Sequence, residues 1–107
     1  MRIEQFDSER AFGYKQITTF FQDFSIADAF GLDAIKDTYE RAFEEWKSDY
    51  KYLTELVMVL NWKSFIHYER GNETLCELYC DLFEKAREYA WDNLKGEELS
   101  YFLTTTD

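Results

Sequence analysis

Acidic side chains recur every three or four residues in the stretch ETLCELYCDLFEKAREYAWD, residues 73–92. They are Glu73, Glu77, Asp81, Glu84, Glu88 and Asp92. On a helix, which turns by about 100° per residue, these carboxylates fall within a sector of about 100°, and neighbours lie about 6 Å apart along the axis. Like charges at this spacing repel by about 0.2–0.5 kcal/mol per pair. Because the spacing resembles the phosphate repeat of a nucleic-acid strand, the row predicts an interaction with a basic, nucleic-acid-binding surface.

A second acidic row precedes the first one in the chain. Its members, again at helical spacing, are Asp33, Asp37, Glu40 and Glu44. Few basic residues accompany the two rows, although Lys85 lies at the edge of the first one and can relieve the charge of Asp81. The alternative interpretation of both rows is a solvated helix face that keeps the protein soluble. Solvated faces usually intersperse the two signs of charge, which these rows do very little.

Trp91 projects into the first row, close to the direction of Glu73 around the helix axis. An aromatic side chain rimmed by charge often anchors a partner protein, so Trp91 is a candidate contact residue, followed by Trp62 and Tyr101. Packing of Trp91 against the closing segment, residues 101–102, is an equally good interpretation.

His67, the only histidine, shares a helix face with apolar residues of the segment 53–64. A histidine on such a face is most often a hydrogen-bonded core or boundary residue, and no nucleophile or paired acid at a familiar spacing accompanies it. A zinc site made of His67, Cys76 and Cys80 would lack a fourth ligand. Glu-x-x-His pairs, phosphate loops, dinucleotide fingerprints and calcium loops are absent from the sequence. We therefore expect no enzymatic activity, no metal and no cofactor.

The 107 residues suffice for one compact domain with a real core, and we expect residues 1–107 to form a single helical domain. The absence of proline and the presence of only four glycines favour helices. Acidic residues outnumber basic ones by 22 to 12, which gives a formal net charge of -10 and a pI near 4.5. Such a surface repels phosphate, so we expect a basic partner and no direct binding of nucleic acid.

The spacing of apolar residues predicts an all-α fold, a small helical bundle. Helices are expected over residues 14–30, 32–47, 49–70 and 73–92, and after a break at residues 93–96 a short closing helix is expected over EELSYFL, residues 97–103. The segment 49–70 is the longest, and it is apolar over so much of its circumference that it should occupy the middle of the bundle. Gly71 and Asn72 leave a very short connection, so 49–70 and 73–92 should form a central antiparallel hairpin. Residues 1–13 fit a minor strand as well as an irregular arm.

Capping residues mark the expected helix ends. Gly31 should end the first helix, and Asp33 should lie near the cap of the second. Within the first helix, Asp23 or Ser25 could cap a short continuation. Asn72 should cap the helix that carries the first acidic row.

No apolar run has the length of a signal-peptide core or of a membrane span. The most apolar stretch, residues 53–66, is interrupted by Glu55 and Lys63. Cys76 and Cys80 would lie one helical turn apart, an awkward position for a mutual disulfide, and are better read as thiols in a reducing compartment. We therefore expect a cytoplasmic protein that does not bind membranes.

Three stretches together carry a family resemblance: FGYKQITTFFQDFSIADAFG (12–31), YKYLTELVMVLNWK (50–63) and NLKGEELSYFLTTTD (93–107). They are similar to a family of small acidic proteins carried by phages and conjugative elements of Gram-positive bacteria, among which we count anti-CRISPR inhibitors of type II RNA-guided nucleases. The resemblance spans most of the chain, but its stretches are packing and capping patterns and transfer no functional residue. It implies a host-defence inhibitor whose target has positively charged channels for nucleic acid.

The charge pattern and the resemblance lead to one expectation. The chain should be a small, non-enzymatic inhibitor from a mobile genetic element that acts in the cytoplasm of the host bacterial cell. It should bind the basic nucleic-acid-binding surface of a nuclease complex, such as a type II CRISPR nuclease, as a nucleic-acid mimic, although an inhibitor can also destabilise the guide complex or block domain motion. The first alternative is a structural or accessory protein of the element that forms a homodimer or larger homo-oligomer through aromatic surface. The second is an enzyme centred on His67, which would need a pocket that holds this residue beside a carboxylate or a thiol.

Overall fold

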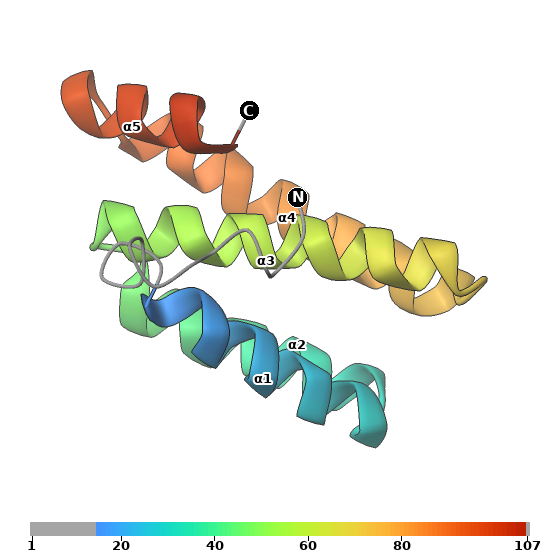
Figure 1. Cartoon of the computed structure of the whole chain (residues 1–107). Coiled ribbons are helices and arrows are strands. Elements are labelled where there is room, and N and C mark those ends of the chain that lie inside the picture. Colours follow the sequence, from blue (N-terminus) through green and yellow to red (C-terminus); the bar gives the residue numbers. More distant parts are fainter. Residues whose placement is uncertain (1–14, 107) are drawn as a thin grey trace.

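The computed structural model describes the backbone of residues 15–106 and the side-chain environments of residues 17–106. Within those residues it contains five helices and no strand (Figure 1). The helices are α1 (Lys15–Phe30), α2 (Leu32–Trp46), α3 (Tyr50–Glu69), α4 (Glu73–Asn93) and α5 (Gly96–Thr106). The predicted all-α fold is confirmed, whereas the minor strand considered for residues 1–13 lies outside the described residues.

Helix α3 occupies the middle of the bundle. Figure 1 shows it between the α1–α2 pair on one side and α4 with α5 on the other. Every residue from Leu53 to Leu60 is buried, because a helix that is apolar around most of its circumference must be covered on all sides. The predicted central position is confirmed, although α4 is the longer helix, with 21 residues against 20. Neither α3 nor any other helix of the described chain is long and apolar enough to cross a membrane.

The four surrounding helices each bury one stripe in a shared core. Their buried residues include Ile17, Phe20 and Phe24 of α1, Ile35 and Tyr39 of α2, Tyr79, Leu82, Ala86 and Ala90 of α4, and Phe102 of α5. Burial of one large apolar side chain contributes about 1.5–3 kcal/mol. Since each stripe covers only part of a helix, the opposite faces of these helices remain in solvent.

A glycine turn joins α3 to α4. Gly71 has a φ of 72°, and its amide donates a hydrogen bond to the carbonyl of Tyr68 at 3.1 Å. The amide of Asn72 donates to the carbonyl of His67 at 2.8 Å. These two bonds form a Schellman motif, which satisfies carbonyl groups at the end of the helix and requires the left-handed conformation that glycine adopts readily. The predicted central hairpin is confirmed, and α3 and α4 lie side by side in Figure 1.

The cap predicted at Asp23 or Ser25 is wrong. Helix α1 continues without a break past Asp23 and Ser25, so neither residue starts a new helical segment. Gly31, with a φ of 109°, ends α1 as predicted, and its carbonyl also accepts a hydrogen bond from the amide of Ile35 at 3.2 Å. Gly31 is therefore the N-cap of α2. Asp33 lies near this cap, as predicted, and its charge in the first turn interacts favourably with the helix dipole.

The closing helix extends further than the sequence predicted. Helix α5 begins at Gly96 and reaches Thr106, whose hydroxyl donates a hydrogen bond to the carbonyl of Phe102 at 2.7 Å. Phe102 is buried in the core, so α5 is held on the bundle by an aromatic anchor near its carboxyl end.

Two N-caps allow a matched test of capping. The carboxylate of Asp49 accepts hydrogen bonds from the amides of Lys51, at 3.1 Å, and Tyr52, at 3.3 Å. Asn72 occupies the N-cap of α4 without a side-chain hydrogen bond to that helix. We expect Asp49→Ala to lower the free energy of unfolding by about 1 kcal/mol and Asn72→Ala by less than about 0.5 kcal/mol. Urea denaturation followed by circular dichroism measures both changes, and equal losses would contradict the role given to Asp49.

Candidate functional site

All six acidic residues of the first predicted row lie on α4 and are exposed. We call Glu73, Glu77, Asp81, Glu84, Glu88 and Asp92 the α4 row. Helix α4 is continuous over this segment, so the helical rotation keeps the six residues in one sector, opposite the buried side that contains Tyr79 and Leu82. At 1.5 Å per residue, the row extends over about 28 Å.

Within residues 17–106, no lysine or arginine forms an ion pair with the α4 row. Lys85, which was expected to relieve Asp81, is exposed and makes no ion pair with it. The guanidinium of Arg87 lies over the ring of Phe83, 5.1 Å from the ring centroid. The charge of the row is therefore screened only by dissolved ions and water, so these carboxylates can form ion pairs with a basic partner.

The second predicted row has more basic side chains close to it than the α4 row has. Asp33, Asp37, Glu40 and Glu44, which we call the α2 row, are all exposed on α2. Glu44 forms an ion pair with Lys47, in which Oε2 and Nζ are 3.0 Å apart. The Nε of Arg41 donates to the backbone carbonyl of Asp37 at 3.4 Å, which places a guanidinium beside the row. Of the two rows, the α4 row is the stronger candidate for binding a basic surface.

Trp91 is the most exposed of the three candidate aromatic anchors. Its exposed fraction is 54%, whereas Trp62 and Tyr101 are half-buried. The ring of Trp62 packs against Phe21 with the centroids 5.6 Å apart, and the ring of Tyr101 packs edge-on against Tyr50 at 5.3 Å. Trp91 therefore adds an apolar contact to the face that carries the α4 row.

A buried polar cluster that the sequence did not reveal joins α1, α3 and α4. The Oδ2 atom of Asp28 accepts a hydrogen bond from the Nζ of Lys63 at 2.5 Å and lies 3.0 Å from the Nε2 of His67. The Oδ1 atom of Asp28 accepts from the hydroxyl of Tyr79 at 2.5 Å. The Nζ of Lys63 also donates to the hydroxyl of Ser25 at 3.3 Å. We call Asp28, Lys63, His67 and Tyr79 the Asp28 cluster.

The Asp28 cluster is largely buried, and aromatic rings pack against it. Lys63 and His67 are each only 4% exposed, and the rings of His67 and Tyr79 stack with centroids 5.5 Å apart. The ammonium of Lys63 lies 5.1 Å from the centroid of the Phe21 ring. Burial raises the pKa of the Tyr79 hydroxyl, and the hydrogen bond to Asp28 and the charge of Asp28 raise it further. Tyr79 is thus a neutral hydrogen-bond donor at physiological pH.

The geometry around His67 suits cross-linking of helices better than catalysis. His67 is a hydrogen-bonded core residue, as predicted, and Asp28 supplies the carboxylate that an enzyme would also need. One cavity on the described surface lies between α1 and α2, and another lies between α3, the middle of α4 and the carboxyl end of α5; neither is lined by a member of the Asp28 cluster. A substrate in either cavity would not reach the imidazole of His67.

The two cysteines are free thiols. Cys76 is half-buried and Cys80 is exposed. Burial raises the pKa of the Cys76 thiol, and the neighbouring Cys80, Glu77 and Glu73 raise it further, so Cys76 is a poor thiolate nucleophile. In the part of the chain that the structure describes, no group of three or more histidine, cysteine, aspartate or glutamate side chains is arranged to hold a metal ion.

Comparisons of the chain with protein-family models, with curated proteins and with solved structures find no match. The family resemblance drawn from the sequence therefore stays a prediction, and the physical properties of the surface carry the functional argument.

Because the Asp28 cluster contains a buried ion pair, we expect the loss of one of its charges to lower the stability of the protein strongly. Asp28→Asn removes the negative charge opposite the buried ammonium of Lys63, and we expect the free energy of unfolding to fall by about 3–5 kcal/mol. The double variant Asp28→Asn with Lys63→Met should recover a large part of that loss, because no unpaired charge then remains buried. Asp23→Asn, at an exposed position on the same helix, should change stability by less than about 0.5 kcal/mol. Urea denaturation tests this, and a loss no larger in Asp28→Asn than in Asp23→Asn would refute the assigned role.

The raised pKa values of two buried tyrosines predict that the protein loses stability at alkaline pH. Burial raises the pKa of Tyr39 to about 12, and burial together with Asp28 raises the pKa of Tyr79. The unfolded chain releases these protons near pH 10, whereas the folded chain retains them. The contribution of these tyrosines to the free energy of unfolding is therefore complete below about pH 10. Above that pH the free energy of unfolding falls by about 1.4 kcal/mol per pH unit for each tyrosine.

We expect Tyr79→Phe to reduce this slope by about 1.4 kcal/mol per pH unit, measured from urea midpoints at a series of pH values between about 10 and 12. Tyr68→Phe, at an exposed tyrosine, is the matched control. An identical alkaline slope in the two variants would contradict the retained proton on Tyr79.

Proposed function

We propose that this protein is a non-enzymatic inhibitor that binds the basic nucleic-acid-binding surface of a nuclease complex through the α4 row. One observation carries the proposal: six exposed carboxylates share one face of a continuous helix, and no base within residues 17–106 pairs with them. A groove lined by lysine and arginine can supply the missing counter-charges, as it does for phosphate.

The α4 row has the sign and the linear arrangement of a nucleic-acid strand at lower charge density. Six charges over about 28 Å correspond to one charge every 6 Å or so, whereas one strand of a duplex carries a charge every 3.4 Å of axis. Mimicry of this kind supplies steering and complementarity rather than a copy of every phosphate contact.

Two properties of α4 favour binding over mere solubility. The helix is already packed on α3, so the row loses little conformational freedom when a partner binds. Repulsion between the five neighbouring pairs of the row opposes the free state by about 1–2.5 kcal/mol in total. A basic partner relieves this repulsion, and the gain adds to the attraction between the two surfaces.

The resemblance noted in the sequence suggests the class of partner. A type II RNA-guided nuclease has a positively charged channel for its heteroduplex and arginine side chains that read its recognition element. We propose that the protein is an anti-CRISPR-like inhibitor, encoded by a phage or conjugative element, that occupies such a surface in the host cytoplasm. The α2 row would give a second, weaker patch, and Trp91 an apolar contact.

A second candidate function is a homo-oligomeric accessory protein of the element. The observation that favours it is a set of large apolar side chains in solvent, among them Phe65, Tyr68 and Trp91. A dimer that dissociates on dilution in analytical ultracentrifugation, combined with no affinity for the nuclease, would favour this alternative.

Charge reversal tests the proposed function. The variant Glu77→Lys, Glu84→Lys and Glu88→Lys places repulsive charges in the middle of the α4 row. We expect it to raise the Kd for a guide-loaded type II nuclease at least about 100-fold and to abolish inhibition of plasmid cleavage. Because the interaction is electrostatic, binding of the unaltered protein should weaken steadily as the salt concentration rises.

The matched control is Glu69→Lys, Glu97→Lys and Glu98→Lys, which changes three exposed glutamates elsewhere and gives the same net charge. It should retain inhibition, and circular dichroism should show both variants to be folded. Equal loss in the two variants would reduce the effect to net charge, and retained inhibition in the row variant would place the interface elsewhere.

A further inference from the structure

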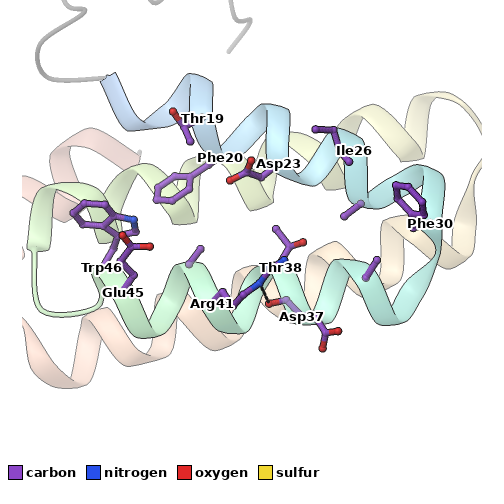
Figure 2. A pocket seen from close by; sticks show the side chains of 13 residues that line it. Thr19, Phe20, Asp23, Ile26, Phe30, Asp37, Thr38, Arg41, Glu45 and Trp46 are labelled. Carbon is purple, nitrogen blue, oxygen red and sulfur yellow. Dashed lines mark hydrogen bonds between the residues drawn. The ribbon is translucent and has the colours of Figure 1, made fainter.

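A second surface with different chemistry lies between α1 and α2. Figure 2 shows a groove there, with side chains of both helices along its length. Its volume is about 590 Å³. Phe20, Ala27 and Thr38 are buried and form its floor. The wall from Thr19 to Phe30 spans eleven residue steps of α1, or about 16 Å, which corresponds to three helical turns.

Both ends of the groove offer apolar side chains. Figure 2 places Phe30 at one end, with Ile26 next to it on the same wall, and Trp46 at the other end. Phe30 is 78% exposed and Ile26 is 61% exposed, whereas Trp46 is half-buried. Large apolar side chains at this level of exposure, beside a buried apolar floor, are typical of a surface that a partner covers.

Acidic residues outnumber basic ones along the groove. Asp23 stands on the α1 wall, Asp37 lies on α2, and Glu45 lies beside Trp46 at one end. Arg41 is the base among the lining residues, and its Nε already donates to the carbonyl of Asp37 at 3.4 Å. Three carboxylates against one guanidinium give the groove a negative balance in addition to the net charge of -10 on the whole chain.

This combination selects among the possible occupants. An anionic membrane surface or a nucleic acid would be repelled by the carboxylates. A second copy of this acidic chain would bring more negative charge to the groove. A basic partner is attracted, and a groove three helical turns long between two helices matches the helix-in-groove mode of recognition.

We propose that the groove between α1 and α2 binds an amphipathic, basic helix of a partner protein. The helix would seat apolar residues at positions i, i+4, i+7 and i+11 between the Ile26–Phe30 end and the Trp46 end, because these positions span about 16 Å on one face. A lysine or arginine at the edge of that face would meet Asp23. This proposal does not depend on the α4 row and holds even if that row is only a solvated face.

The experiment uses two synthetic peptides of 18 residues made of leucine and lysine. One carries its leucines on a single helical face, and the other has the same composition in scrambled order. Fluorescence anisotropy is measured at 0.3 M salt, where non-specific attraction is weak. We expect the amphipathic peptide to bind the full chain about ten-fold more tightly than the scrambled one, and nuclear magnetic resonance shifts to map to α1 and α2.

Two matched variants locate the contact. Ile26→Ser with Phe30→Ser removes the exposed apolar wall without changing the charge and should weaken the amphipathic peptide about ten-fold. Phe65→Ser with Tyr68→Ser removes similar side chains from another face and should have no effect. Both pairs are exposed, so circular dichroism should show a native fold.

Equal binding of the two peptides, equal effects of the two variants, or shifts confined to α4 would each overturn the proposal. A dimer of the unaltered protein that Ile26→Ser with Phe30→Ser dissociates would also overturn it, since the occupant would then be a second copy. The Lys variant of the α4 row should keep peptide binding within about two-fold, which separates failure of this proposal from failure of the proposed function.

Discussion

Helix α3 is buried on every side between Leu53 and Leu60, and this constraint places the remaining helices. Each of them must give one apolar stripe to cover α3, and its remaining surface then faces water. A row of like charges can accumulate only on those outer surfaces. The α4 row is an uninterrupted line for this reason, because the opposite side of the same helix is committed to the core by residues such as Tyr79 and Ala86.

The Asp28 cluster is a polar cross-link inside this largely apolar frame. A buried ion pair adds little net stability, because the cost of removing both charges from water offsets most of their attraction. It strongly disfavours any packing in which the pair is not formed, however. Asp28 on α1 meets Lys63 and His67 on α3 and Tyr79 on α4, so one carboxylate fixes three helices relative to one another. The cluster therefore favours this one arrangement of the three helices. Because it fixes the position of α1, which forms one wall of the groove between α1 and α2, it also influences the shape of that groove.

Local patterns were sufficient to predict the helices, the central hairpin and the composition of the α4 row. The hairpin follows from Gly71, and the row follows from a charge period that matches the helical turn. The cap proposed at Asp23 or Ser25 was wrong because α1 continues without a break to Phe30, whereas Asp33 does lie near the cap of α2, which is Gly31. The Asp28 cluster was missed because its members are brought together over 35 to 51 positions of sequence. The groove depends on how two helices pack, which periodicity within either helix does not describe.

Trp91 gives the face that carries the α4 row a property that carboxylates alone cannot provide. A line of negative charge attracts basic proteins of many kinds and discriminates poorly among them. An indole that is 54% exposed in the same line must be dehydrated by any ligand that covers it, and this is favourable only where the ligand offers an apolar recess in register. Attraction and discrimination would then reside in different side chains of one helix, and either could change during evolution without loss of the other.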